Sequence, residues 1–177
     1  MKLAIRQIYI TDSGCECVVN AANANLAEGS GVCGAIFEHA GRNRLRDACS
    51  RYGGCSTGDA VITPGFKLCK YIIHAVGPIY NDGKHHEKEK LESCYRKAMN
   101  LAYENRCESI CFPLISGGIY GYPLDECFMI ALSALNDWAI EHKEPDIDVV
   151  FAIPEEYKYN KGKELIESLK LSWRLND

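Results

Sequence analysis

The chain alternates between short apolar runs and longer segments with a helical spacing of apolar residues, and this alternation restricts the fold. The apolar runs predict strands at 2–10, 16–21, 59–63, 71–76, 109–115 and 147–153. The helical patterns lie between or after them, at 32–50, 86–104, 124–142 and 155–170. Runs such as Tyr71-Ile72-Ile73 are continuously apolar, which is typical of strands covered on both faces. The sequence therefore predicts an α/β fold, a three-layer α/β/α sandwich with a mixed, partly parallel sheet of about six strands.

Size and charge set the broad class of the protein. The chain of 177 residues has no internal repeat or linker, so we expect a single domain over residues 1–177. Its 20 basic and 24 acidic residues give a net charge of −4, which disfavours a nucleic-acid partner. No apolar run approaches the ~20 residues of a membrane span, and Arg6 interrupts the apolar N-terminal segment. These features predict a cytoplasmic protein without a membrane partner.

The cysteines and histidines do not form a recognisable metal-binding pattern. The ten cysteines include no C-x-x-C pair and have no histidine at zinc-finger spacing, so we interpret them as reduced, mostly buried thiols. His74 lies in an apolar run, where a hydrogen-bonded core histidine is the favoured interpretation and a ligand the alternative. His85 and His86 lie in a charged stretch without evident further metal ligands. We predict no metal and no cofactor.

Two glycine-rich segments, 29–34 and 116–121, each follow a predicted strand and lead toward a predicted helix. Glycine-rich turns let backbone N–H groups approach phosphate oxygens, and a helix N-terminus adds partial positive charge. Ligands of open α/β sheets bind beyond the carboxyl ends of the strands. We therefore expect both segments to line one cleft suited to a diphosphate.

The first of these segments also matches the dinucleotide-binding pattern G-x-G-x-x-G at Gly29, Gly31 and Gly34. Seven residues, 22–28, separate it from the preceding strand, whereas a dinucleotide fingerprint lies directly in a strand-to-helix turn. A nicotinamide-type site is therefore disfavoured. The chain contains no G-x-x-x-x-G-K-[ST] motif, which excludes a P-loop nucleotide hydrolase.

Asn20 and Asn23 bracket the end of the second predicted strand. Their side-chain amides can hydrogen-bond sugar hydroxyls, and asparagine also caps turns where strands end. Beside a phosphate-binding loop, both interpretations stay open.

Five segments together resemble the macrodomain family, in order and across almost the whole chain. They are Asn20-Ala21-Ala22-Asn23, Gly29-Ser30-Gly31-Val32-Cys33-Gly34-Ala35-Ile36, Thr57-Gly58-Asp59-Ala60-Val61-Ile62-Thr63, His74-Ala75-Val76-Gly77-Pro78 and the run from Phe112 to Pro123. The resemblance implies binding of ADP-ribose or O-acetyl-ADP-ribose. Some members of the family hydrolyse O-acetyl-ADP-ribose or remove ADP-ribose from proteins or nucleic acids.

The resemblance also implies roles for individual residues. Asn20 and Asn23 match the pair that faces the distal ribose, Asn23 being tied to catalysis in hydrolytic members, and Tyr120 matches the aromatic residue that covers this ribose. The implied catalytic residues are Asn23 and Cys33. The implied ligand-binding residues are Ile10, Asn20, Asn23, Ser30, Gly31, Val32, Cys33, Gly34, Ile36, Ile115, Ser116, Gly117, Gly118, Ile119, Tyr120 and Gly121.

The chain departs from the hydrolytic subgroup at several positions. Cys33 replaces an aspartate that helps to activate water, and an ordinary thiol is the poorer base at neutral pH. Tyr9 stands where the family has an aspartate for the adenine amino group, and Asp12 reaches that place only with a shift in register. Phe37 replaces a histidine, and His39 points to another side of the helix.

These departures leave two functions open. The first is hydrolysis at the distal ribose, either of O-acetyl-ADP-ribose or of a mono-ADP-ribosyl linkage, with an ADP-ribosylated protein as a candidate partner. The second is an ADP-ribose reader without catalysis, which the loss of the aspartate at position 33 favours.

Overall fold

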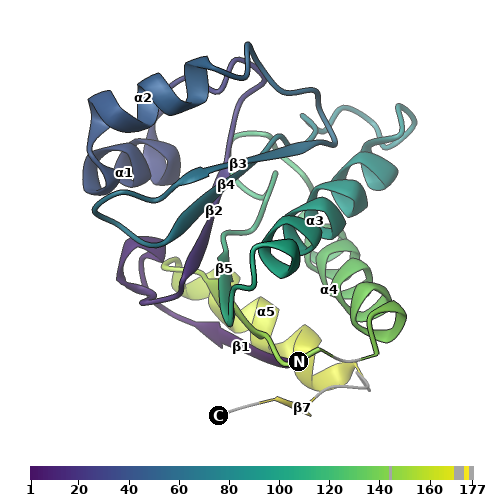
Figure 1. The fold of residues 1–177 in the computed structure, drawn as a ribbon. Helices are drawn as coiled ribbons and strands as arrows, with labels where there is room; N and C mark the ends of the chain where they lie inside the picture. The colour runs from purple at the N-terminus through teal and green to yellow at the C-terminus, as the bar shows by residue number, and fades with distance from the viewer. Residues whose placement is uncertain (144, 170–173, 176–177) are drawn as a thin grey trace.

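The computed structural model describes residues 1–143, 145–169 and 174–175. It contains one mixed sheet with the strand order β3-β4-β2-β5-β6-β1-β7 (Figure 1). The strands are β1 (Lys2–Arg6), β2 (Cys17–Ala21), β3 (Ala60–Pro64), β4 (Tyr71–Ala75), β5 (Ser109–Phe112), β6 (Asp148–Ala152) and β7 (Arg174–Leu175). Neighbouring strands are parallel except β3 and β4. The predicted mixed, partly parallel sheet of about six strands is confirmed, and the two-residue β7 extends its edge.

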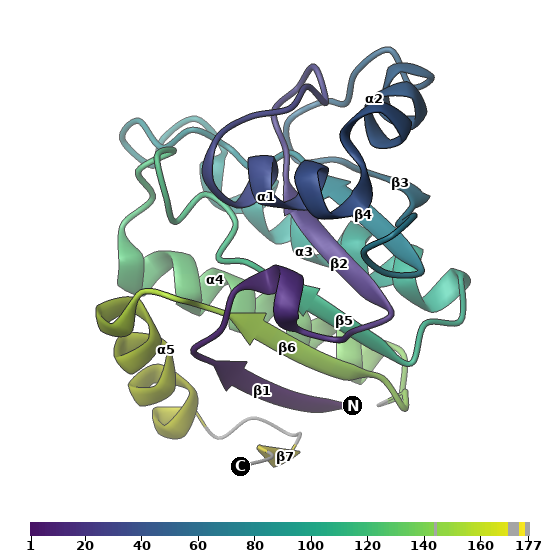
Figure 2. The ribbon, with the colours of Figure 1, turned by 90° about the vertical axis from the view of Figure 1, so that its left-hand side faces the viewer.

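Helices cover both faces of the sheet, as the predicted sandwich requires. They are the 3-10 helix η1 (Ile10–Asp12) and the α-helices α1 (Gly31–Ala40), α2 (Arg42–Ser50), α3 (Glu87–Glu104), α4 (Leu124–Glu141) and α5 (Glu156–Ser168). In Figures 1 and 2, α3, α4 and α5 lie on one side of the sheet, and η1, α1 and α2 lie on the other. Among the described residues, no helix is long and apolar enough to cross a membrane.

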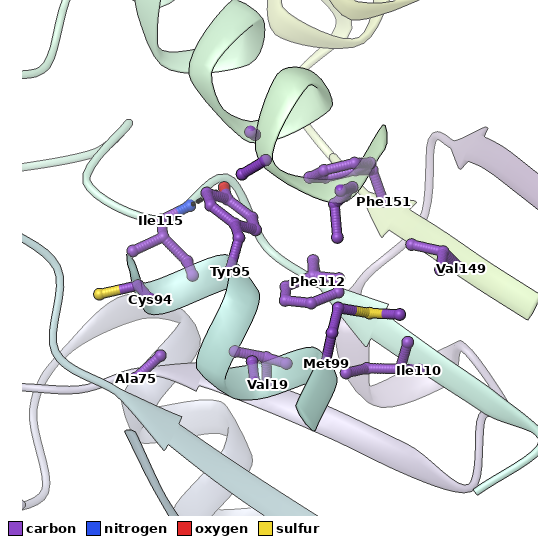
Figure 3. Packing of buried hydrophobic residues seen from close by; sticks show 14 of the residues in the cluster. Val19, Ala75, Cys94, Tyr95, Met99, Ile110, Phe112, Ile115, Val149 and Phe151 are labelled. Atoms are coloured by element: carbon purple, nitrogen blue, oxygen red, sulfur yellow. Dashed lines mark hydrogen bonds between the residues drawn. The ribbon is translucent and has the colours of Figure 1, made fainter. Parts of the chain in front are cut away.

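The two faces of β2 enter two separate cores. Val19 packs with Tyr95 and Phe112 beneath α3 and α4, whereas Val18 packs beneath α1 and α2. Both valines are fully buried, which is the reason that this strand is apolar without alternation. In the first core, Tyr95 also accepts a hydrogen bond at its hydroxyl oxygen from the Ile115 N–H, at 3.1 Å (Figure 3). The aromatic core thus holds the chain directly before the second glycine-rich loop.

Several predicted boundaries are wrong, each for a local reason. The predicted strand 2–10 ends at Arg6, because the chain turns there to bury Ile10 in η1 beneath α1. The predicted helix 32–50 is two helices, because Gly41 between them has φ of 101°. The predicted strand 109–115 ends at Phe112, since Pro113 cannot donate to the ladder. Of the predicted helix 155–170, residue 170 lies outside the described residues.

Candidate functional site

Both glycine-rich loops meet around one cavity, as their positions after strands predict. β2 and β5 are parallel neighbours, so their carboxyl ends lie at the same edge of the sheet. The cavity there has a volume of about 440 Å³. Its lining residues are Ala21, Asn23, Gly29, Ser30, Gly31, Val32, Cys33, Pro113, Leu114, Ser116, Gly118, Ile119, Tyr120 and Glu155.

The predicted site residues divide into three groups. The cavity brings together Asn23, Ser30, Gly31, Val32, Cys33, Ser116, Gly118, Ile119 and Tyr120. Four others are buried at 4% exposure or less and do not line it: Ile10, Asn20, Ile36 and Ile115. Gly34, Gly117 and Gly121 belong to the loops or the helix start without lining the cavity. Gly29 also lines the cavity, as expected of the segment 29–34, although the list of ligand-binding residues did not include it. That list also lacked Ala21, Pro113, Leu114 and Glu155.

Of the missed residues, Glu155 had a usable signal. It follows the end of β6, which is the parallel neighbour of β5. The rule that places ligands beyond parallel strand ends applies to this segment as it does to the two loops. The Glu155 carboxylate lies 3.0 Å from the Lys158 ammonium. Burial alone would raise the pKa of Glu155, but the hydrogen bond from Lys158 and the charge of that residue lower it overall.

The first loop ends in the N-terminus of α1, which begins at Gly31 with a left-handed φ of 60°. The first N–H groups of an α-helix have no partner within the helix and carry partial positive charge. Ser30, Gly31, Val32 and Cys33 all line the cavity at this end of the helix. This end of the cavity is therefore suited to phosphate oxygens.

The second loop is fixed by close approaches that leave little room for larger side chains. Ser116 takes a left-handed φ of 63°, and its hydroxyl donates to the Pro78 carbonyl at 2.7 Å. A Cβ at Gly77 would lie 2.4 Å from the Ser116 hydroxyl, so glycine is needed there. A Cβ at Gly117 would lie 2.5 Å from the Leu114 side chain. The Leu114 side chain therefore fills the space that a larger side chain at position 117 would need.

The Cys33 side chain, in the first turn of α1, forms hydrogen bonds with the first glycine-rich loop and with Asn20. Its sulfur lies 3.3 Å from the Gly29 N–H nitrogen and 3.6 Å from the Asn20 side-chain nitrogen, both of which donate to it. The Cys33 thiol is also 3.8 Å from the Ala27 carbonyl oxygen. The side chain is 7% exposed and lines the cavity, so its sulfur is held by the loop and is also reachable from the cleft.

Behind Cys33 lies a buried polar network around His74. The His74 Nδ1 is 3.2 Å from the Asn20 amide nitrogen, and its Nε2 is 3.0 Å from the Thr63 hydroxyl. Burial lowers the pKa of His74 to about 4, so the ring is neutral at pH 7. The interpretation of His74 as a hydrogen-bonded core histidine is confirmed. Asn20 joins this network, and its Oδ1 is buried without a hydrogen-bond partner among the described residues.

Asn23 caps the turn of the first loop and also lines the cavity. Its Oδ1 accepts from the Ala27 N–H at 3.0 Å, and its Nδ2 donates to the Ala27 carbonyl at 2.9 Å. The two interpretations of this asparagine, turn cap and ligand contact, are therefore compatible with one position.

Cys33 lines the cavity, whereas the other residues that depart from the hydrolytic pattern lie away from it. Tyr9 is 68% exposed, and neither it nor Asp12 lines the cleft. Phe37 is fully buried in the core beneath α1 and α2. His39 is exposed and its Nδ1 lies 2.8 Å from the Ala35 carbonyl oxygen, so it does not substitute for a histidine at position 37.

Comparisons with known proteins agree with this geometry. The family model of the Macro domain matches residues 19–131. The chain is 44% identical to a macro domain-containing protein of Chlorobaculum tepidum, over 76% of this chain and 78% of the relative. A macro domain-containing protein of Listeria monocytogenes is 41% identical over 95% of this chain and 98% of the relative.

Solved structures of similar proteins include two complexes with ADP. The Oceanobacillus iheyensis macrodomain with ADP superposes with a TM-score of 0.84 at 36% identity, over 93% of this chain and 92% of that chain. The Trypanosoma brucei macrodomain in complex with ADP gives a TM-score of 0.84 at 35% identity, over 93% and 68%. From its sequence, its sheet and its paired loops, this chain belongs to the Macro domain family.

Proposed function

We propose that this protein binds ADP-ribose and its derivatives in the cleft, with the diphosphate between the two loops. The observation that carries the proposal is the meeting of both loops around one cavity at the carboxyl edge of β2 and β5. The N-terminus of α1 supplies N–H groups and positive charge there. The ADP in the two similar macrodomain structures supports this choice of ligand.

We further propose hydrolysis at the distal ribose, of O-acetyl-ADP-ribose or of a mono-ADP-ribosyl linkage on a protein. In this mechanism Asn23 orients the ribose, Tyr120 shapes the ribose pocket and the loop amides hold the diphosphate. Water then attacks the acetyl carbonyl carbon of O-acetyl-ADP-ribose, or the anomeric carbon of the distal ribose in a mono-ADP-ribosyl linkage. The bond from that carbon to the ribose oxygen or to the protein side chain breaks, and the leaving group takes up a proton. Because Cys33 stands in place of the loop aspartate, the ligand's own phosphate or the Cys33 sulfur orients the water.

A non-catalytic ADP-ribose reader is the second candidate. The contacts of the Cys33 sulfur with Gly29, Asn20 and Ala27 favour it, because they employ this side chain in holding the loop.

We also propose that residues 1–177 act as one domain, since β1 and β7, from the two ends of the chain, pair in the same sheet.

Binding is tested by isothermal titration with ADP-ribose, with AMP and ribose 5-phosphate as comparison ligands. Gly118→Asp adds a negative charge at the cavity wall and should weaken ADP-ribose binding at least about tenfold. Gly118→Ala is the matched control, because a Cβ at this position meets nothing within 4 Å. Equal affinity of both variants would place the diphosphate elsewhere.

Turnover is tested with O-acetyl-ADP-ribose and with a mono-ADP-ribosylated protein. If the chain is a hydrolase, Asn23→Ala should lower the rate at least about tenfold, whereas Asn25→Ala, at an exposed position outside the cavity, should not. If the natural protein binds ADP-ribose without turnover and Cys33→Asp creates turnover, the chain is a reader.

A further inference from the structure

Glu155 brings a negative charge to the cleft in which a diphosphate is proposed to bind. Among the described residues that line the cleft, it is the only one with a carboxylate or a cationic side chain. Burial alone would raise the pKa of Glu155, but the hydrogen bond and charge of Lys158 lower it overall, so the carboxylate is ionised at neutral pH. Next to phosphate groups this charge would repel the ligand. Glu155 is therefore suited to a part of the ligand that donates hydrogen bonds.

The strand order places Glu155 at the end of the cleft away from Asn23. Asn23 follows β2, the second glycine-rich loop follows β5, and Glu155 follows β6. These three strands are successive parallel neighbours (Figure 2), and adjacent strands lie about 4.8 Å apart. The strand between Asn23 and Glu155 thus carries the second loop. A ligand that extends across this loop from Asn23 reaches Glu155 with its opposite end.

The segment that carries Glu155 is held in place by its neighbours. The Ile153 N–H, two residues earlier, donates to the Arg6 carbonyl at 2.9 Å. Lys158, in the first turn of α5, donates to the Glu155 Oε1 at 3.0 Å. The Glu155 side chain is still 47% exposed, so its carboxylate can also accept hydrogen bonds from a ligand in the cleft.

The two riboses of ADP-ribose lie on opposite sides of its diphosphate. The proposed function places the distal ribose at Asn23 and the diphosphate between the loops, so the ribose of the adenosine lies toward Glu155. Ribose hydroxyls donate hydrogen bonds, and dinucleotide-binding folds use an acidic residue to accept that of the adenosine 2′-hydroxyl. A phosphate at this 2′ position would instead place negative charge against the carboxylate.

We propose that Glu155 selects ligands by their adenosine ribose, accepting a hydrogen bond from its 2′-hydroxyl and disfavouring a 2′-phosphate. The inference rests on the proposed binding of ADP-ribose and specifies the class of ligand that the cleft takes. This class is ADP-ribose derived from NAD, whereas the 2′-phosphate form derived from NADP is disfavoured. Glu155 acts on specificity and takes no part in the reaction at the distal ribose.

The first test compares ADP-ribose with ADP-ribose 2′-phosphate by isothermal titration of the full chain. The natural protein should bind ADP-ribose at least about tenfold more tightly, and the difference should shrink at higher ionic strength. Glu155→Gln removes the charge and should bring the two affinities within about threefold of each other. Glu156→Gln is the matched control, because it removes an equal charge at the next, exposed position outside the cleft. It should keep the natural preference.

The outcomes of this test separate the inference from the proposed function. Equal affinities of the natural protein for the two ligands, or an unchanged preference in Glu155→Gln, would overturn the inference and leave ADP-ribose binding intact. Failure of the natural protein to bind either ligand would overturn the proposed function, and the inference with it.

A second comparison identifies the group of the adenosine that Glu155 contacts. Removal of the adenosine 2′-hydroxyl from ADP-ribose should weaken binding to the natural protein at least about threefold, and binding to Glu155→Gln by a smaller factor. The hypoxanthine analogue, which lacks the 6-amino group of adenine, should lose the same factor in both proteins. The reverse pattern would assign Glu155 to the base and overturn the inference.

Discussion

His74 links the core to the first glycine-rich loop through two side chains. Its Nδ1 contacts the Asn20 amide, and the same amide donates to the Cys33 sulfur. With Nδ1 as acceptor, the Nε2 carries the proton and donates to the Thr63 hydroxyl. The neutral ring satisfies both contacts, so protonation of His74 would disturb the support of Cys33.

The depressed pKa of His74 predicts a loss of stability at mildly acidic pH. Burial lowers the pKa from 6.5 to about 4, so between these values the unfolded chain binds more protons than the folded protein. The neutral His74 therefore contributes fully to the free energy of unfolding above about pH 6.5. As the pH drops through this range to below 4, about 3 kcal/mol of that free energy is lost. Urea unfolding at several pH values measures it.

The control for this prediction is His74→Gln, which does not titrate. The variant should be less stable at pH 7 but should lose less stability between pH 6.5 and pH 4 than the natural protein. An equal pH dependence of the two proteins would assign the loss to other groups.

Among side chains, the sequence could predict those whose neighbours are consecutive in the chain. Gly31, Val32 and Cys33 follow directly from the loop pattern. It could not predict that Asn20 turns from the cleft to His74, because that contact joins residues 54 positions apart. Glu155 was missed because it belongs to no sequence motif. Its position after the end of β6 was the available signal, because ligands bind beyond the ends of parallel strands.

The loop before α3 is held by one carboxylate. Glu87 is 2% exposed, and its Oε1 accepts N–H groups of Asn81, Asp82 and Gly83 while its Oε2 accepts that of His85 at 2.6 Å. Burial alone would raise the pKa of Glu87, but the backbone hydrogen bonds hold it at about 2. Asp82, His85 and Glu87 cluster within 4.8 Å, and these hydrogen bonds account for their proximity.

Glu87→Gln should loosen this loop. The side-chain NH2 group of the glutamine would face a backbone N–H donor of the loop and could not accept its hydrogen bond. Hydrogen exchange of the backbone N–H groups at residues 81–85 should therefore accelerate at least about tenfold. Hydrogen exchange at pH 7 measures it. Because the pKa of Glu87 is depressed, its stabilisation is complete above about pH 4.5 and is lost as the pH falls through 2. Glu89→Gln, exposed in the same helical turn, should leave the exchange unchanged.

Helix α5 packs against β1 and α4 through Gly162. A Cβ there would lie 2.5 Å from the Ile5 Cδ1 and 2.8 Å from the Phe128 ring. Gly162→Ala should therefore lower the free energy of unfolding by about 1–2 kcal/mol, because overpacking outweighs the gain in helix propensity. Chemical denaturation measures the change. Glu167→Ala, on the exposed face of α5, should not destabilise, and a stabilised Gly162→Ala would show that the helix shifts freely.

Element types followed from the sequence more readily than element ends. The buried strands and long helices α3 and α4 were predicted because their apolar patterns are local. The break at Gly41 was missed because a helical pattern continues across it, although glycine readily takes the φ of 101° that separates α1 from α2. β7 lies at the edge of the sheet and has two described residues, too few for a recognisable pattern.

For the molecule as a whole, ligand binding and folding are linked. If ADP-ribose binds only the folded chain, a concentration of 100 times Kd adds about 2.7 kcal/mol of stability. For a chain of this size, the Tm should rise by about 5–10 °C, as differential scanning calorimetry can measure. Gly118→Ala should show the same rise and Gly118→Asp a smaller one at the same ligand concentration. An unchanged Tm of the natural protein would argue against the cleft as an ADP-ribose site.

The parallel pairing of β2 with β5 has a consequence for the speed of recognition. Adjacent strands lie about 4.8 Å apart, held by backbone hydrogen bonds, so the bases of the two loops keep a constant separation. Because one sheet carries the bases of both loops, we expect ligand binding without the closure of one domain on another. Stopped-flow association rates should therefore climb in proportion to ligand concentration, without the plateau that a slow closing step imposes. The spacing of the two loop bases is therefore set when the sheet forms, before any ligand binds.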